Sequence, residues 1–381
     1  MRIYIAKRLL LFIPGIILVV LLSFTLLHYA PGDPVERILS DQGIYGGELF
    51  SNTTDQKIKD ELTEKLGLNL PLFYFSLSSL SETENQNSTE VTSWRNYIPA
   101  ISLNSKNQFH RWLIGDGNNF GGILRGDLGI SWASKENVST ILSSRIKWSI
   151  LFALISVFLA YFISIPTGLL AAANPDSKFS KWTAIIFSIL FSIPSFWFAT
   201  LLMLLFCNPD ILNVLPSSGV GPAGGFPIGT GILNIVFQTI PYLILPTICF
   251  TYSSLAFLSG SIRVSVEDIL KEDYIRTARA KGLNERSVLY RHALRNALLP
   301  MITIFSHVLP FAVSGSVILE TIFTIPGMGQ AIYFSLSAQD YPVIINVFML
   351  TGIFTMSAFL LGDILYALVD PRISFTQQTL S

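Results

Sequence analysis

Residues 273–300 read DYIRTARAKGLNERSVLYRHALRNALLP and lie between two long apolar runs. This stretch is the most cationic part of a chain whose 381 residues are 51% hydrophobic and only 13% charged. Soluble domains carry about 25% charged residues, so the solvent for most of this chain is lipid rather than water. The composition therefore predicts a polytopic membrane protein in which the quoted stretch belongs to a polar loop between two spans.

The polar loop predicts two short helices that meet at a glycine. The first covers 265–281, where apolar residues recur at every fourth position and so share one helical face. These residues are Val266, Leu270, Tyr274 and Ala278. Gly282 stands where a left-handed residue ends a helix. Asn284 can cap the second helix, with Glu285 in its first turn.

Six stretches are apolar and long enough to span a bilayer, which takes about 20 residues of helix. They are 9–29, 150–172, 182–207, 235–258, 298–323 and 343–369. The first follows basic residues, as a signal peptide would, but it is longer than the usual apolar region and lacks a small residue at the −3 position. We expect an uncleaved anchor, and an all-α fold with six transmembrane helices.

Lysine and arginine in the loops predict the orientation of these spans. The N-terminus carries three, the loop 173–181 two and the loop 260–297 eight, whereas 208–234 and 324–342 carry none. Both termini and the two basic loops are therefore predicted to be cytoplasmic. The long segment after the first span is then extracytoplasmic, because long loops cross largely regardless of their charge.

The spans divide the chain into three parts. Residues 1–29 form the N-terminus and first span, 30–146 the extracytoplasmic segment, and 147–381 a core of five spans that contains the loop 260–297. In the outer segment, residues 55–75 predict a helix that stops at Gly67 and Pro71. Residues 76–118 are rich in Ser, Asn and Thr and predict a loop-like insertion.

Motifs for catalysis and for metal binding are absent from the sequence. There is no nucleotide-binding loop, no zinc-peptidase motif and no nucleophile elbow. The two cysteines, Cys207 and Cys249, have no C-x-x-C spacing and predict structural thiols. The four histidines, His28, His110, His292 and His307, are scattered. We expect no catalytic residue, no metal site and no cofactor bound by this chain, and the zero net charge gives no support for a nucleic-acid partner.

Ionisable residues and prolines inside the spans are candidates for a translocation pathway. Ionisable residues in lipid are functional candidates by default, although capping or snorkelling also explains Glu320 and Asp363, which lie near interfaces. Prolines favour kinks, which either simple bundle packing or broken helices around a pathway would explain. The candidate pathway or gating residues are Glu320, Pro310, Ser314 and Pro194.

The quoted stretch resembles the cytoplasmic EAA loop of ABC importer permeases, in the form found in the dipeptide, oligopeptide and nickel subgroup. Shorter family motifs occur in the same order along the chain. They are APGDP (30–34), KLGLNLPL (65–72), GDLGIS (126–131), PGMG (326–329), DYPV (340–343) and VDPRISF (369–375). Together these motifs cover the chain except for about residues 76–118.

The resemblance implies a six-span subunit of a bacterial cell membrane, with both termini inside, surrounded by lipid. It implies four kinds of partner or ligand: a second homologous permease, two ABC ATPases that use ATP and Mg, an extracytoplasmic solute-binding protein and its solute. The loop would form coupling helices that sit in a cleft of the ATPase. The coupling residues it implies are Asp273, Tyr274, Arg276, Ala278, Arg279, Ala280, Lys281, Gly282, Arg291 and Asn296.

One position departs from the general family pattern, which has a glutamate six residues before the glycine. Arg276 stands there, which resembles the peptide-transporter variant and speaks against a glutamate-mediated contact. The long insertion at 76–118 leaves the docking of the solute-binding protein open.

The resemblance implies that the chain forms half of a pathway for dipeptides or oligopeptides. The same architecture carrying nickel or another small solute is the alternative, and the spans contain no histidine cluster that would favour it. More distant alternatives are an exporter or an importer without a binding protein, a membrane-embedded enzyme, and a scaffold that docks a cytoplasmic protein without transport.

Overall fold

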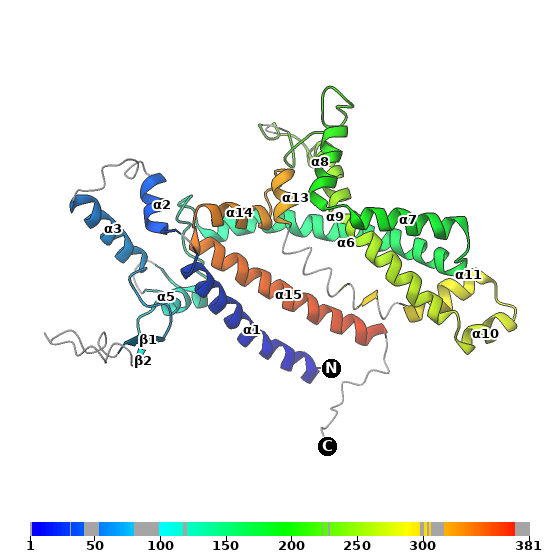
Figure 1. Cartoon of the computed structure of the whole chain (residues 1–381), viewed down its shortest axis with the longest axis horizontal. Helices are drawn as coiled ribbons and strands as arrows, with labels where there is room; N and C mark the ends of the chain where they lie inside the picture. Colours follow the sequence, from blue (N-terminus) through cyan, green and yellow to red (C-terminus); the bar gives the residue numbers. More distant parts are fainter. Residues whose placement is uncertain are drawn as a thin grey trace, which may run out of the picture. The chain divides into compact units, whose positions relative to one another are not determined.

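The computed structural model describes residues 2–30, 32–41, 53–79, 99–116, 120–222, 224–227, 229–297, 301–302, 305 and 316–369 (Figure 1). The chain divides into two compact units. The first comprises Met1–Gly15, Ser143–Tyr333 and Leu350–Ser381, and the second Ile16–Leu142 and Phe334–Met349. Most described residues are helical, as the sequence predicts.

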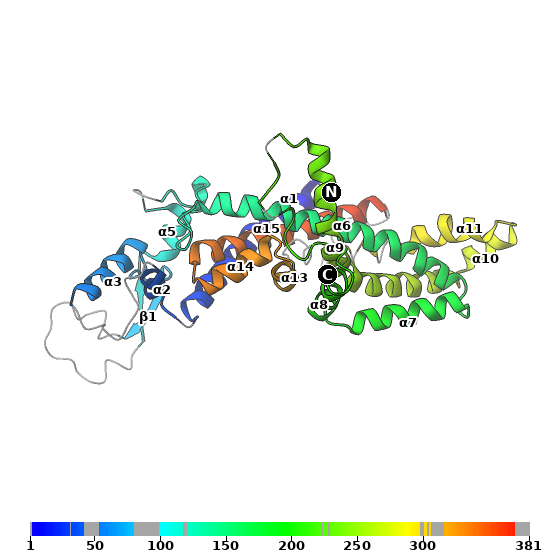
Figure 2. The ribbon, with the colours of Figure 1, turned by 90° about the horizontal axis from the view of Figure 1, so that it is seen from above.

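Long helices dominate the first unit. They are α6 (Val138–Ala173), α7 (Lys178–Ser192), α8 (Ser195–Phe206) and α9 (Ile232–Ile269), followed by the shorter α10 (Asp273–Ala280), α11 (Glu285–Ser287), the π-helix η3 (Val288–Ala293) and α13 (Val317–Ile322). Helices α1 (Arg2–His28), α14 (Met328–Ser337) and α15 (Tyr341–Val369) contribute to both units, as does α6, whose first five residues belong to the second unit. Figures 1 and 2 show α7 and α9 side by side, with α10 and α11 at the end away from α8 and α13.

Four described helices, α1, α6, α9 and α15, are long and apolar enough to cross a membrane, and α7 with α8 makes a fifth candidate if the pair counts as one span. The stretch 182–207, expected as one span, is divided between α7 and α8, which are bent by 100° at a break. Pro194 lies at that break in an extended conformation, having no N–H with which to continue the helix. The Tyr252 hydroxyl donates a hydrogen bond of 2.8 Å to the carbonyl of Ile193, which satisfies a backbone acceptor at the break. Most of the expected span at 298–323 lies outside the described residues.

The core of the first unit lies between α6, α9 and the segment that follows η3. Leu169 of α6 and Ile262 of α9 are fully buried against Ala293 and Ala297. Gly168 lets α6 and α9 approach closely, because an added Cβ there would lie 2.6 Å from Cγ2 of Ile262. Helix α9, which is followed directly by α10 in the chain, is therefore packed into the apolar core.

The second unit contains α2 (Pro34–Asp41), α3 (Thr53–Leu66), α5 (Gln108–Ile114), the 3-10 helix η2 (Ile123–Arg125), and the strands β1 (Phe75–Ser79) and β2 (Pro99–Leu103). Helix α3 ends where the sequence predicts, and Gly67 follows it with φ +75°. The strands pair antiparallel, with Phe75 opposite Leu103.

The loop-like reading of 76–118 is wrong for its described part, which contains β2, α5 and most of β1. The residues of FSLSS alternate between apolar and polar, a short period-two pattern that a dominant Ser/Asn/Thr composition obscures. Asn107 caps α5 by accepting a 2.7 Å hydrogen bond from the N–H of His110. Phe109 and Trp112 bury one face of α5 in edge-on contact with Phe24, at centroid distances of 6.0 and 5.8 Å.

Candidate functional site

The helix predicted over 265–281 is two helices in the structure. Helix α9 ends at Ile269, three residues turn, and α10 starts at Asp273 with Glu272 in an extended N-cap conformation. The break resets the helical phase, so Ile275 and Ala278 form the buried face of α10 and Tyr274 is 42% exposed. Of the residues that the four-residue period selects, Val266 and Ala278 are therefore buried, whereas Tyr274 is exposed.

The turn after α10 confirms the predicted role of Gly282. Its N–H donates to the carbonyl of Arg279 at 2.9 Å, and the N–H of Leu283 donates to the carbonyl of Ala278 at 3.4 Å. This is the Schellman arrangement, with Gly282 at φ +80°. An added Cβ would meet nothing within 4 Å, so backbone conformation rather than space selects glycine here.

The second helix begins as predicted and is tied to the first across the turn. The Asn284 side chain accepts a 2.8 Å hydrogen bond from the N–H of Ser287. Glu285 receives two hydrogen bonds from the Arg279 guanidinium, at 2.8 and 3.2 Å. A bidentate pair of this kind fixes geometry more than it adds stability, since exposed ion pairs contribute about 0–1 kcal/mol. The caps and the pair together set the angle between α10 and α11.

The second helix changes to a π-helix at Val288–Ala293 before it returns to α geometry through Ala297. Val288 packs with Ile275 and Ala278 beneath α10. Further along, Leu289 packs into the core formed by α6 and α9. One helical segment thus joins the cluster beneath α10 to the core of the unit. Sequence reasoning missed the π-helix, for which the residues give no signal, although such turns often occur at functional sites.

The remaining predicted coupling residues lie on the outer face of this helix pair. Six of them are exposed: Asp273, Arg276, Arg279, Ala280, Lys281 and Arg291. Arg276 makes a weak 3.4 Å contact with Asp273, one helical turn away. Asn296, also exposed, reaches back to the hydroxyl of Tyr274. Within the described residues, Lys281, Arg291 and the neighbouring Arg286 and Arg295 make no ion pair, so the face is cationic and open to a partner.

Glu320, a predicted pathway residue, is 1% exposed and accepts hydrogen bonds at the start of α14. Its carboxylate accepts from the N–H of Gln330 at 2.8 Å and from the hydroxyl of Ser149 at 3.0 Å. Ser149 in turn accepts from the N–H of Met328 at 2.8 Å. A carboxylate at a helix N-terminus satisfies free N–H groups and complements the helix dipole. The geometry is that of a buried helix cap.

The predicted pathway residues are not brought together by the described structure. Pro194 lies at the exposed break between α7 and α8, and Glu320 is buried against α14. Pro310 and Ser314 lie outside the described residues. The other charged residue within a span, Asp363, pairs with Arg8 at 2.9 Å. Ser149 and Gln330, which hold Glu320, were not predicted, although the PGMG motif between Glu320 and Gln330 marks their neighbourhood.

In the second unit, two of the short motifs meet through Asp340. Its carboxylate accepts hydrogen bonds from the hydroxyl of Ser131 at 2.5 Å and from the N–H of Trp132 at 3.0 Å. Asn346 donates to the carbonyl of Leu128 at 3.0 Å. The motifs GDLGIS and DYPV, separated by about 200 residues, therefore form one hydrogen-bonded joint.

The motif APGDP is anchored by Asp33. Its carboxylate accepts from the N–H of Val35 at 2.9 Å and pairs with Lys59 of α3 at 2.8 Å. Burial on its own would raise the pKa of Asp33, but the hydrogen bonds from Lys59 and Val35 and the charge of Lys59 outweigh it, so the pKa is lowered. Hydrogen bonds to Asp33 and Glu36 raise the pKa of Lys59.

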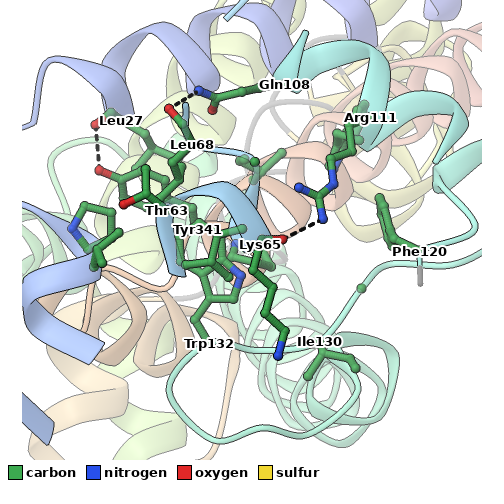
Figure 3. Close-up of a pocket in the computed structure, with 18 of the residues that line it drawn as sticks. Leu27, Thr63, Lys65, Leu68, Gln108, Arg111, Phe120, Ile130, Trp132 and Tyr341 are labelled. Carbon is green, nitrogen blue, oxygen red and sulfur yellow. Dashed lines mark hydrogen bonds between the residues drawn. The ribbon is translucent and has the colours of Figure 1, made fainter. Parts of the chain in front are cut away.

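These motifs line a cavity of about 980 Å³ in the second unit, which sequence reasoning did not predict (Figure 3). Figure 3 shows Arg111 donating to the carbonyl of Lys65, and Gln108 donating to that of Leu68. The Tyr341 hydroxyl donates to the carbonyl of Leu27 at 3.1 Å. Among the residues that the structure describes, no cluster of His, Cys, Asp or Glu could hold a metal ion.

Comparisons with known proteins agree with the motifs. Residues 164–375 match the model of the family described as binding-protein-dependent transport system inner membrane component. The oligopeptide transport system permease protein AppB of Bacillus subtilis is 34% identical over 98% of this chain and 100% of its own. The dipeptide permease DppB of Escherichia coli is 30% identical over 97% of this chain and 98% of its own, and the di/tripeptide permease DppB of Pseudomonas aeruginosa is 29% identical over the same shares. The chain therefore belongs to the family of binding-protein-dependent transport system inner membrane components.

Proposed function

We propose that this chain is a transmembrane permease subunit of an ATP-driven ABC importer and forms half of the pathway for dipeptides or oligopeptides. The observation that carries the proposal is the match to peptide permeases over nearly the whole chain, with coverage of almost all of each relative. The family is an inner-membrane transport component, and the helices apolar enough to span a membrane fit a multi-pass protein of the bacterial plasma membrane.

The coupling segment, residues 267–297, is proposed to dock on cytoplasmic ATPases. Its outer face is exposed and cationic, and its inner face is buried on the core through Val288 and Leu289. Because one face is free and the other is anchored in the core, a force on α10 is passed to α6 and α9. Movement of an ATPase cleft would in this way reorient the membrane helices.

The energy for that movement comes from outside this chain in the proposed mechanism. The chain shifts between two packed states, and a ligand shifts such an equilibrium only by its differential affinity for the two states. ATP and Mg are proposed to bind two partner ATPases, with no cofactor bound by this chain. A second homologous permease would complete the pathway, and an extracytoplasmic binding protein would deliver the solute.

Copurification followed by transport assays tests the proposal. A tagged chain is purified in mild detergent, and its partners are identified by mass spectrometry. We expect a second permease and one or two ATPases. The assembled complex, reconstituted in liposomes with its binding protein, should then import a short peptide in an ATP-dependent way.

The alternative solute is tested on the same liposomes with Ni²⁺ in place of peptide. Import of Ni²⁺ without import of peptide would replace the peptide assignment and keep the importer. Failure to recover any ATPase in several detergents would contradict the importer itself.

A further inference from the structure

The cavity in the second unit is lined by residues of that unit alone, and the proposed mechanism does not use it. Its volume of about 980 Å³ is at the upper end of the range for small-molecule sites. Four of the short motifs contribute to its walls, through Asp33, Lys65, Ser131 and Tyr341 among others. A site of this size has room for a short peptide.

Four of the seven lysine, arginine and aspartate side chains that line the cavity are engaged by other groups of the protein. The lining cations are Lys59, Lys65, Arg111 and Lys135, and the lining anions are Asp33, Asp60 and Asp127. Lys59 pairs with Asp33 at 2.8 Å. Arg111 pairs with Asp116 at 3.1 Å. Asp127 accepts hydrogen bonds from two backbone N–H groups at 2.8 and 2.9 Å.

Three charged side chains remain for a ligand. Within the described part of the chain, Lys65 and Lys135 make no ion pair, and Asp60 meets only the neutral amide of Gln56, at 3.3 Å. The cavity thus offers two cations and one anion to whatever enters it. Lys135 also has a left-handed backbone with φ +62°, a conformation that costs a lysine energy and that the hydrogen bond from its N–H to the carbonyl of Ser131 helps to hold.

The apolar walls lie beside these charges. Trp132 and Tyr341 face each other with ring centroids 5.4 Å apart. Figure 3 shows the Lys65 side chain extending towards Trp132 and Ile130. Trp112, another lining residue, is 9% exposed, and its indole N–H has no acceptor among the described residues. Aromatic walls with a few polar groups are typical of sites for small organic ligands.

We propose that this cavity is a binding site for a short zwitterionic peptide, with its carboxylate at Lys65 and Lys135, its ammonium at Asp60 and an apolar side chain at Trp132 and Tyr341. Asp60 and Lys65 both belong to α3 and both line the cavity, so one ligand that enters it can meet an anion and a cation. The site would hold peptide on this unit independently of a solute-binding protein.

This inference rests on the proposed function, because it assigns the same class of solute to a second place on the chain. The test uses the complete transporter in lipid nanodiscs without its solute-binding protein. The probes are Ala-Ala-Phe, its C-terminal amide and its N-acetyl form, and their binding is measured by saturation-transfer NMR titration. We expect the amide and the acetylated peptide to bind about fivefold more weakly than the free peptide, as loss of one partly exposed ion pair implies.

Variants connect that preference to the cavity. Lys65→Gln combined with Lys135→Gln should weaken binding of the free peptide about fivefold and leave binding of the amide unchanged. Asp60→Asn should act on the free peptide but not on the acetylated one. Lys57→Gln is the matched control, since Lys57 is an exposed lysine of α3 outside the cavity wall and should leave all three peptides unaffected.

Three results would overturn the inference: equal binding of the free and amidated peptides, equal binding by the lysine double variant, or displacement of the peptide by decanoate at equal concentration. Import of Ala-Ala-Phe in the presence of the binding protein is measured in parallel. Import without carboxylate-dependent binding in nanodiscs would reject the cavity site and leave the proposed function standing. Absence of any peptide import would count against the proposed function itself.

Discussion

Asn296 donates a 2.6 Å hydrogen bond to the hydroxyl of Tyr274, across 22 residues of sequence. Tyr274 lies in the first turn of α10, and Asn296 lies near the end of the helix that follows the π-helix. The bond therefore closes the coupling segment at the end opposite Gly282. The two short helices are held at both ends, by the Schellman turn at one and by this bond at the other.

Tyr274→Phe should loosen the coupling segment without unfolding the protein. The ring stays, and only one largely exposed hydrogen bond is lost, so we expect about 0.5–1 kcal/mol less stability. The ratio of transported peptide to hydrolysed ATP should fall, because α10 would move without carrying the core with it. This ratio is measured on the complex in liposomes.

Tyr290→Phe is the control for this prediction. Tyr290 is also exposed and belongs to the same segment, and its hydroxyl makes no hydrogen bond within the described residues. An equal loss of coupling in both variants would mean that the Tyr274 bond has no special role.

Gly282 should be replaceable by asparagine more readily than by alanine or aspartate. The position requires φ +80°, where a side chain costs about 1–2 kcal/mol, and asparagine tolerates this region better than most residues. There is no clash to relieve, so the order of transport activity should be Gly, Asn, Ala in a fully assembled complex. Uptake by liposomes gives that order directly.

Gly260→Ala separates this backbone effect from a general loss of flexibility. Gly260 lies inside α9, has open space at its Cβ position and has no positive φ, so alanine should be neutral or slightly stabilising there. Normal transport by Gly282→Ala would contradict the requirement for a left-handed residue.

The sequence predicts those features of the coupling segment that depend on local chemistry. Gly282 and Asn284 are recognised because turn and cap positions select few residue types. The phase of α10 is missed because the break at Leu270–Glu272 contains neither glycine nor proline, and nothing local marks it. The π-helix at Val288–Ala293 is missed for a similar reason, since its residues give no local signal for it.

The second unit is predicted less well, because its contacts are between residues far apart in sequence. The motifs around Asp33, Ser131 and Asp340 can be recognised in the sequence. Their spacing, however, does not predict the hydrogen bond between Ser131 and Asp340. The cavity is lined by residues on both sides of that contact, so the sequence does not predict the cavity either. Hydrophobic periodicity shows which face of a segment is buried and which face meets water or lipid. It carries no information about which segments contact each other.

Stability of the second unit should depend on pH through Asp33. Its pKa is lowered in the folded protein, so the carboxylate stabilises the fold at all pH values above its unfolded pKa of about 3.9. That contribution is lost as the pH falls below this value and through the lower folded pKa. Asp33→Asn should therefore lower the melting temperature at pH 7, and its difference from the wild type should shrink as the pH falls below about 3.9.

Asp176→Asn is the control for the pH series, because Asp176 is exposed and makes no hydrogen bond or ion pair through its side chain within the described residues. Melting is followed by intrinsic fluorescence of the full-length chain in detergent. A difference between wild type and Asp33→Asn that stays constant from pH 7 to pH 3 would exclude this carboxylate as its source.

Glu320→Gln distinguishes a helix cap from a pathway residue. The neutral amide still accepts from the N–H of Gln330, but it loses the charge at the start of α14, and its NH₂ cannot accept from Ser149. A hydrogen bond to a buried charged group contributes about 1.5–3 kcal/mol, so the variant should melt earlier. Glu61→Gln, at an exposed carboxylate of α3, should melt as the wild type does. If Glu320 acts only as a cap, transport per folded complex should remain normal at a temperature where both proteins are folded. Unchanged melting together with lost transport would instead place Glu320 on the pathway.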